Sequence, residues 1–87
     1  MMNKHVYERI QAMREHFGWD ETDTVAFMTS CVVEEVNELK ESLNDEANFK
    51  KEIADVLMYT ISICMDRGYD IETLILDKID EVMQRDY

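Results

Sequence analysis

The chain has 87 residues, a length that suits one domain with a small core. It carries 20 Asp and Glu against 9 Lys and Arg, which gives a formal net charge of -11. Because nucleic-acid phosphates are bound by clustered Lys and Arg, this charge argues against a nucleic-acid-binding surface. With 46% hydrophobic residues, the chain is also too apolar for a disordered acidic tail.

The composition predicts an all-α protein, since proline is absent and glycine occurs only at positions 18 and 68. No apolar run reaches the roughly 18 residues of a membrane span, and the charged start lacks the apolar centre of a signal peptide. Cys31 and Cys64 fall inside helical patterns and form no disulfide framework. We therefore expect a cytoplasmic protein with no membrane partner.

In chain order, the apolar spacing first predicts a helix from about Asn3 to Phe17. Gly18 is expected to end it in the left-handed conformation. The segment from Asp20 to Asp23 offers side chains that can cap a second helix, which spans about Thr24 to Leu43.

A turn with a capping residue is expected at Asn44 and Asp45, before a third helix from about Ala47 to Arg67. Gly68 closes this helix. Asp70 is predicted to cap a fourth helix, whose apolar stripe is Ile71, Leu74, Ile75, Ile79 and Val82.

Short loops make consecutive helices antiparallel, so these elements predict a four-helix up-and-down bundle. Further apolar residues lie outside the main stripes, and helices that are apolar on two sides usually bury the second side against another subunit. We therefore expect oligomerisation, as a homodimer or homotetramer, to complete the bundle. The residues concerned are Phe27, Met58, Ile61, Met65, Leu76 and Met83.

Two pairs of acids border the apolar stripes of the second and third helices. Glu35 and Glu38 form one pair, and Glu52 and Asp55 form the other, each pair one helical turn apart. If antiparallel packing brings them together, two charges about 5 Å apart repel by roughly 3 kcal/mol at an effective dielectric near 20. A cation would offset this repulsion, and ligands that are all oxygen favour Mg²⁺, with Mn²⁺ as the other candidate.

A di-iron centre is excluded by ligand type. Di-iron bundles use a Glu-x-x-His motif on two helices. Here the corresponding positions hold Glu38 and Asp55, and both histidines, His5 and His16, lie in the first predicted helix.

The acidic motifs resemble those of a known family. The run Glu34-Glu35-Val36-Asn37-Glu38, followed after 13 residues by Glu52-Ile53-Ala54-Asp55, is similar to the E-E-x-x-E…E-x-x-D signature of MazG-like nucleoside triphosphate pyrophosphohydrolases. These proteins belong to the all-α NTP pyrophosphatase superfamily. The resemblance extends over residues 10 to 87, through HFGWD, CVVEEVNEL and EIADVLMYTISI, and we expect residues 1–87 to form one MazG-like helical domain.

The resemblance implies Mg²⁺-dependent hydrolysis of a nucleoside triphosphate between the α and β phosphates, with release of a monophosphate and pyrophosphate. Its metal ligands would be Glu35, Glu38, Glu52 and Asp55. Glu34, Glu35 and Glu38 are the catalytic candidates. One carboxylate takes the proton of the attacking water, and the motifs do not identify which. Glu34 is expected to point outward, which suits an outer, water-orienting group.

The remaining candidate residues would bind substrate. Lys78 and Arg85 match family positions that meet the distal phosphates, although Val82 stands where the family often has Asn, and Lys78 could instead pair with acids on its own helix. Trp19 could stack on a base or close the end of the bundle. Tyr59 could hydrogen-bond a site carboxylate or the ligand.

Two alternatives remain at this point. The chain could be a non-catalytic acidic helical interaction module whose acids only solvate its surface. Within the superfamily, it could be a phosphoribosyl-ATP pyrophosphohydrolase, but it lacks the Ser-Tyr-Thr stretch that this family carries near its start.

Overall fold

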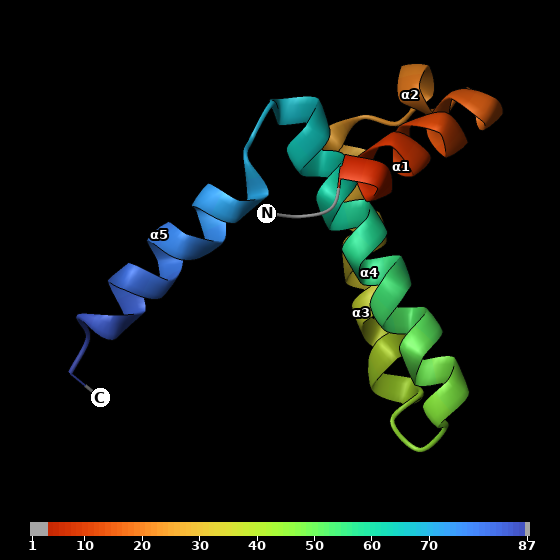
Figure 1. Cartoon of the computed structure of the whole chain (residues 1–87). Helices are drawn as coiled ribbons and strands as arrows, with labels where there is room; N and C mark the ends of the chain where they lie inside the picture. Colours follow the sequence, from red (N-terminus) through yellow and green to blue (C-terminus); the bar gives the residue numbers. More distant parts are fainter. Residues whose placement is uncertain (1–3, 87) are drawn as a thin grey trace.

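The computed structural model describes residues 4–86 and contains helices only in that range. Figure 1 shows five of them in chain order: α1 (Lys4–Phe17), α2 (Trp19–Thr22), α3 (Val25–Glu41), α4 (Glu46–Arg67) and α5 (Ile71–Met83). The all-α prediction is confirmed. The expected first residue of the first helix, Asn3, lies outside the described range.

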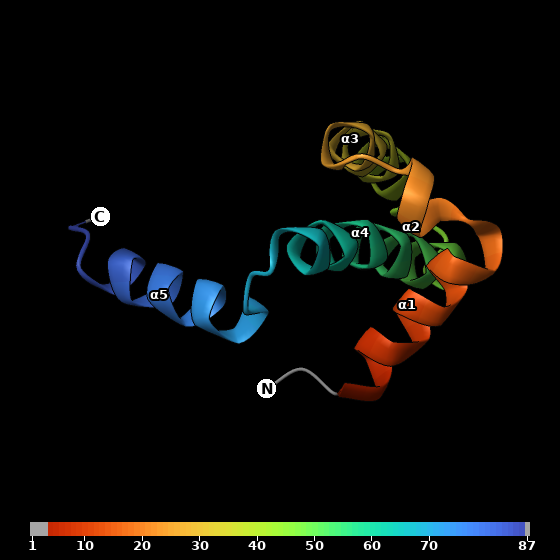
Figure 2. The ribbon, with the colours of Figure 1, turned by 90° about the horizontal axis from the view of Figure 1, so that it is seen from above.

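The longest helices, α3 and α4, form an antiparallel hairpin that is the most extensive helix pair of the chain (Figures 1 and 2). Side-chain caps fix the start of each helix. The Thr24 hydroxyl accepts a hydrogen bond from the Phe27 amide at 3.0 Å, and the Asp45 carboxylate accepts one from the Asn48 amide at 3.2 Å. Because the turn between Glu41 and Glu46 is short, α4 runs antiparallel to α3.

The C-terminal half of α4 is covered by α1, which crosses it (Figure 2). Ile10 of α1, Ile61 of α4 and Ile71 of α5 form the buried apolar cluster, with Tyr7, Cys64 and Met65 packed against it. A bidentate ion pair joins the two helices, because Arg14 Nη1 and Nη2 donate to Asp66 at 2.9 and 3.0 Å. This pair ties α1 to α4 across 52 residues of sequence.

The segment after α1 differs from the prediction. Gly18 adopts the expected left-handed conformation with φ 73°, but residues 19–22 form a helical turn, α2, in place of a capping segment. The cap of the next helix is Thr24, which the sequence pattern placed inside that helix. The reason is that the Thr24 hydroxyl satisfies the free amide of Phe27, a task that the pattern assigned to Asp20–Asp23.

The last helix, α5, begins as predicted. Gly68 is left-handed at φ 70°, and the Asp70 carboxylate accepts a hydrogen bond from the Thr73 amide. However, α5 then projects away from the α3–α4 hairpin (Figures 1 and 2) and makes no extensive contact with any other described helix. The expectation that a short loop makes each helix an antiparallel neighbour is therefore wrong for α5 within one chain. Its apolar residues Leu74, Ile75 and Ile79 remain about half exposed because no described element covers them.

Two further expectations concern the cysteines and the membrane. Cys31 and Cys64 are both free thiols, as predicted. Among residues 4–86, no helix combines the length and the apolar character that a membrane crossing requires.

Candidate functional site

Three carboxylates meet between the two helices of the hairpin. Glu35 comes from α3, and Glu52 and Asp55 come from α4, one turn apart. One oxygen of each lies within 4.8 Å of those of the other two, and all three residues are half-buried. The antiparallel pairing of α3 and α4 creates this group, since it sets the middle of α3 opposite the first half of α4.

The described residues do not supply hydrogen-bond donors for all the oxygen atoms of this carboxylate group. Glu35 Oε2 and Glu52 Oε2 are buried and have no hydrogen-bond partner among the described residues. Burial, followed by the neighbouring Glu38 and Asp55 carboxyls, raises the pKa of Glu35 from 4.5 to about 7. The pKa of Glu52 is also raised, first by burial and then by the charge of Glu38. Buried oxygen atoms without donors, in a site with excess negative charge, fit a divalent cation.

The other two acids of the motif lie at the edge of this group. Glu38 is exposed and lies one turn along α3 from Glu35, close enough to raise the pKa of that residue. It does not belong to the group of three whose oxygens converge. Glu34 is exposed and outside the group, in keeping with its expected outward direction.

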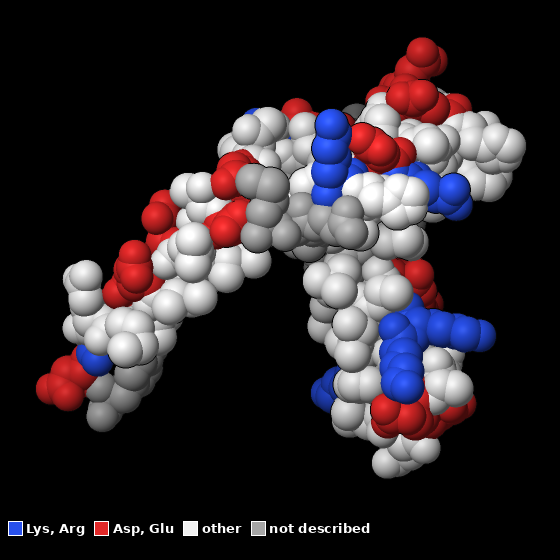
Figure 3. Space-filling model, in the orientation of Figure 1, with Lys and Arg blue, Asp and Glu red and all other residues white. Residues whose placement is uncertain are grey.

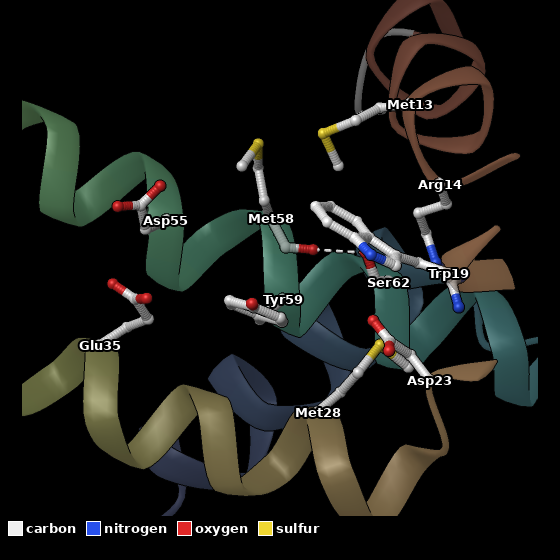
Figure 4. A pocket seen from close by; sticks show the side chains of 10 residues that line it. All are labelled: Met13, Arg14, Trp19, Asp23, Met28, Glu35, Asp55, Met58, Tyr59 and Ser62. Carbon is white, nitrogen blue, oxygen red and sulfur yellow. Dashed lines mark hydrogen bonds between the residues drawn. The ribbon is translucent and has the colours of Figure 1, made fainter. Parts of the chain in front are cut away.

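A pocket of about 260 Å³ opens beside the carboxylates. Figure 4 shows Glu35 and Asp55 at one end of it, Tyr59 and Met58 in the middle, and Trp19, Arg14 and Asp23 at the other end. The complete lining consists of Met13, Arg14, Trp19, Asp23, Met28, Glu35, Asp55, Met58, Tyr59 and Ser62. A largely apolar cavity with polar groups at both ends has the kind of lining found in small-molecule sites.

Two of the predicted substrate-binding residues line this pocket. Trp19 stacks on Phe17 with ring centroids 4.5 Å apart, which holds the indole in place. Tyr59 lies between the two ends of the pocket. Burial, the neighbouring Cys31 thiol and the charge of Glu35 raise the pKa of Tyr59 to about 12, so its hydroxyl stays protonated at neutral pH.

The predicted phosphate-binding residues lie elsewhere in the single chain. Lys78 and Arg85 both bind Glu81, at 3.0 and 2.8 Å, and neither lines the pocket. Figure 3 shows that acidic side chains are spread along α5 rather than gathered at one place on it. The basic side chains of this region therefore do not reach the carboxylate group from their own chain.

The sequence pattern missed two charged pocket residues, Arg14 and Asp23. Arg14 is only 2% exposed, and its Nε has no hydrogen-bond partner among residues 4–86. A signal for it was present, because Arg14 lies four residues after Ile10 on the apolar side of the first helix. Asp23 was expected only as a capping residue, and no spacing rule links it to a pocket.

Comparison with known proteins identifies one family. A family model described as the MazG nucleotide pyrophosphohydrolase domain matches residues 23–86. The match includes the whole α3–α4 hairpin and all five acids of the two motifs. Searches among curated proteins and solved structures found no match.

Proposed function

The chain belongs to the MazG nucleotide pyrophosphohydrolase family, and on this basis we propose that it hydrolyses a nucleoside or deoxynucleoside triphosphate between the α and β phosphates with Mg²⁺. Water adds across the anhydride bond, so the products are a nucleoside monophosphate and pyrophosphate. The observation that carries this proposal is the convergence of Glu35, Glu52 and Asp55 within 4.8 Å beside a pocket.

Glu35, Glu52 and Asp55 would hold the divalent cation, and Glu38 would join them from the exposed rim. Bound there, Mg²⁺ neutralises phosphate oxygens and orients water. The carboxylates alone would repel a triphosphate, so substrate binding at this acidic site depends on the cation. Mn²⁺ has similar ligand preferences and is expected to substitute.

One carboxylate must accept the proton of the attacking water, and we assign this role to Glu38. Glu38 is exposed to water, lies one turn from Glu35 and is not one of the three residues whose oxygens converge. Among the four proposed metal ligands, it is therefore the carboxylate least committed to the cation. Glu34, which is exposed beside it, is an outer group that orients water.

The pocket next to the carboxylates would receive the nucleoside. Trp19 offers an aromatic face on which a base can stack, a contact that is worth about 1–3 kcal/mol per base. The Tyr59 hydroxyl, protonated at neutral pH, can donate a hydrogen bond to the sugar or the α phosphate. The triphosphate then extends toward Glu35 and Asp55.

The basic residues of α5 would reach the distal phosphates from a second copy of the chain. Within one chain α5 lies apart from the hairpin, and Leu74, Ile75 and Ile79 on it are about half exposed. On the hairpin, Val36 and Leu57 are also about half exposed. Packing α5 of each chain on the hairpin of the other would cover both surfaces and bring Lys78 and Arg85 to the partner's site.

The test is a panel of triphosphates assayed for pyrophosphate release in Mg²⁺, together with thermal unfolding with and without the ion. We expect release by the wild type, and stabilisation by about 2.7 kcal/mol at a Mg²⁺ concentration 100 times its Kd. Asp55→Asn is expected to abolish both effects, because it removes a ligand charge and keeps the side-chain shape. Glu41→Gln, an exposed change on α3, is the matched control.

A wild-type protein that releases no pyrophosphate and gains no stability from Mg²⁺ would contradict the proposal. It would favour the alternative of a non-catalytic acidic helical interaction module. Turnover that survives Asp55→Asn would refute the ligand assignment while leaving the activity in place.

A further inference from the structure

The end of the pocket far from the carboxylate group holds an acceptor with no hydrogen-bond donor. Asp23 lines the pocket and is half-buried. Its backbone amide donates to the Trp19 carbonyl at 2.9 Å, which fixes the position of the residue. Its carboxylate accepts no hydrogen bond from any residue in the described range 4–86.

The nearby Arg14 guanidinium does not donate a hydrogen bond to the Asp23 carboxylate in this structure. Arg14 is 2% exposed, and its Nη1 and Nη2 atoms both donate to Asp66. Its Nε is buried without a partner. The hydrogen bond with Asp66 is the main cause that raises the pKa of Arg14, and the charge of Asp23 adds a smaller contribution. Arg14 therefore compensates the charge of Asp23 at this end of the pocket but leaves the carboxylate free to accept hydrogen bonds from a ligand.

The pocket limits which part of a nucleotide meets Asp23. Its 260 Å³ is below the roughly 300–1,000 Å³ of drug-sized sites, and a single-ring base fits better than a double-ring one. With the phosphates at the Glu35 end, the base extends toward Asp23 (Figure 4). In a pyrimidine, the ring position opposite the sugar-bearing N1 is C4, so the C4 substituent lies deepest.

We infer that Asp23 selects a pyrimidine with an amino group at C4, so that the preferred substrate is a cytosine nucleotide. The inference rests on the proposed function. A carboxylate can only accept hydrogen bonds, and the cytosine amine is a donor. Uracil and thymine carry a carbonyl oxygen at the same position, which would face the carboxylate with no proton between them. Asp23 is thus a specificity-determining residue of the pocket.

The experiment compares dCTP with dUTP, which differ in the C4 substituent and in the proton that uracil carries on the adjacent ring nitrogen N3. We expect the wild type to favour dCTP in kcat/KM by roughly 10- to 100-fold, the range for one good base contact. Asp23→Asn is expected to bring the ratio close to one, because the Asn amide can also donate to a carbonyl. Asp20→Asn, an exposed change on α2 outside the pocket, should keep the wild-type ratio.

A second readout does not depend on turnover. Trp19 is the single tryptophan of the chain and lines the pocket, so its fluorescence reports binding there. Titration with dCMP and dUMP should show tighter binding of dCMP to the wild type and a smaller difference in Asp23→Asn. Because Thr24 and not Asp23 caps α3, the variant is expected to keep its helical circular dichroism.

The outcomes separate this inference from the proposed function. Equal use of dCTP and dUTP by the wild type, or a ratio that Asp23→Asn leaves unchanged, would overturn the inference and leave the hydrolase proposal standing. If no triphosphate is hydrolysed, the hydrolase proposal fails and the fluorescence titration still decides the inference. In that titration, a wild type that binds dUMP as tightly as dCMP would overturn the inference about Asp23.

Discussion

Glu35 is the residue on which the proposed chemistry of the site depends most directly. It is the contribution of α3 to the carboxylate group, one of its oxygens is buried without a donor, and its pKa is raised from 4.5 to about 7. Burial and the neighbouring acids therefore oppose its ionised form. A protein that keeps such a residue loses stability when the site holds no cation, which is expected where function requires the charge.

The stability of the metal-free protein should depend on pH, because folding opposes the ionisation of Glu35. A carboxyl with a higher pKa in the folded state holds its proton more tightly when folded, so Glu35 does not oppose folding below about pH 4.5. The destabilisation grows as the pH rises from 4.5 to about 7 and is complete above that value. In EDTA, we expect the Tm of the wild type to fall across this window and that of Glu35→Gln to fall less.

Glu34→Gln serves as the control for this prediction, because Glu34 is the exposed neighbour outside the carboxylate group. Its Tm should follow the wild-type curve. Added Mg²⁺ should raise the wild-type Tm above pH 7 and have little effect on Glu35→Gln. If the Tm of Glu35→Gln fell with pH as steeply as that of the wild type, ionisation of Glu35 would not be the cause of the loss of stability.

At the scale of elements, one ion pair joins α1 to α4 beside the apolar contact of Ile10 with Ile61. Arg14 is almost fully buried, and Asp66 holds both of its terminal nitrogens. Asp66→Asn would leave the buried guanidinium without its counter-charge. Removing one partner of a fully buried pair costs about 3–5 kcal/mol, and the 32% exposure of the Asp66 side chain reduces our expectation to about 2–3 kcal/mol.

Urea unfolding measures this loss as a lower midpoint at an unchanged slope. Glu81→Gln is the comparison, since it breaks two ion pairs that lie on the exposed surface of α5. Ion pairs on the exposed surface contribute little to stability, so this variant should unfold almost like the wild type. If Asp66→Asn and Glu81→Gln lost the same small amount of stability, the Arg14–Asp66 ion pair would not be needed to hold α1 on α4.

The helices themselves could be predicted from the sequence because their signals are local. Gly18 and Gly68 end helices in the left-handed conformation, and Asp45 and Asp70 cap the helices that follow, as expected from their places in the sequence. Each of these effects involves residues within one turn of each other. The helix content and most helix ends follow from such contacts.

Contacts between distant residues could be predicted only where helical spacing implied them. Glu35, Glu52 and Asp55 come together because an antiparallel hairpin aligns two edges that the spacing had already defined. The Arg14–Asp66 pair joins residues 52 apart, and no periodic pattern links them. Asp23 likewise enters the pocket only because α2 turns the chain, a feature that the composition of residues 20–23 did not reveal.

At the scale of the whole molecule, one chain leaves too much apolar surface uncovered. Six apolar residues of α5 are between 37% and 78% exposed, and Val36 and Leu57 on the hairpin are about half exposed. Exposed apolar surface of this extent marks an interaction site. The carboxylates and the basic residues that would complete a triphosphate site also lie on separate arms of the chain (Figure 1). A second copy that supplies α5 would resolve both features.

Subunit complementation tests this arrangement. Asp55→Asn and Lys78→Ala should each be nearly inactive alone, since one lacks a proposed metal ligand and the other a proposed phosphate contact. Consider a two-fold dimer in which α5 of each chain packs on the hairpin of the other, with one chain of each variant. One of its two sites then combines the intact carboxylates of the Lys78→Ala chain with the intact Lys78 of the Asp55→Asn chain. Unfolding and refolding the two together should therefore restore about a quarter of wild-type pyrophosphate release, because random pairing makes half of the dimers mixed and each has one working site.

Recovery should disappear when Ile75→Glu is added to both chains, because a charge on the exposed apolar side of α5 prevents its packing on a partner. Asp80→Ala, on the opposite side of the same helix, should leave recovery intact. A mixture that stays inactive while each variant remains dimeric by light scattering would mean that Lys78 acts within its own chain. A fully active Lys78→Ala protein would instead show that the Glu81 ion pair is the whole role of Lys78.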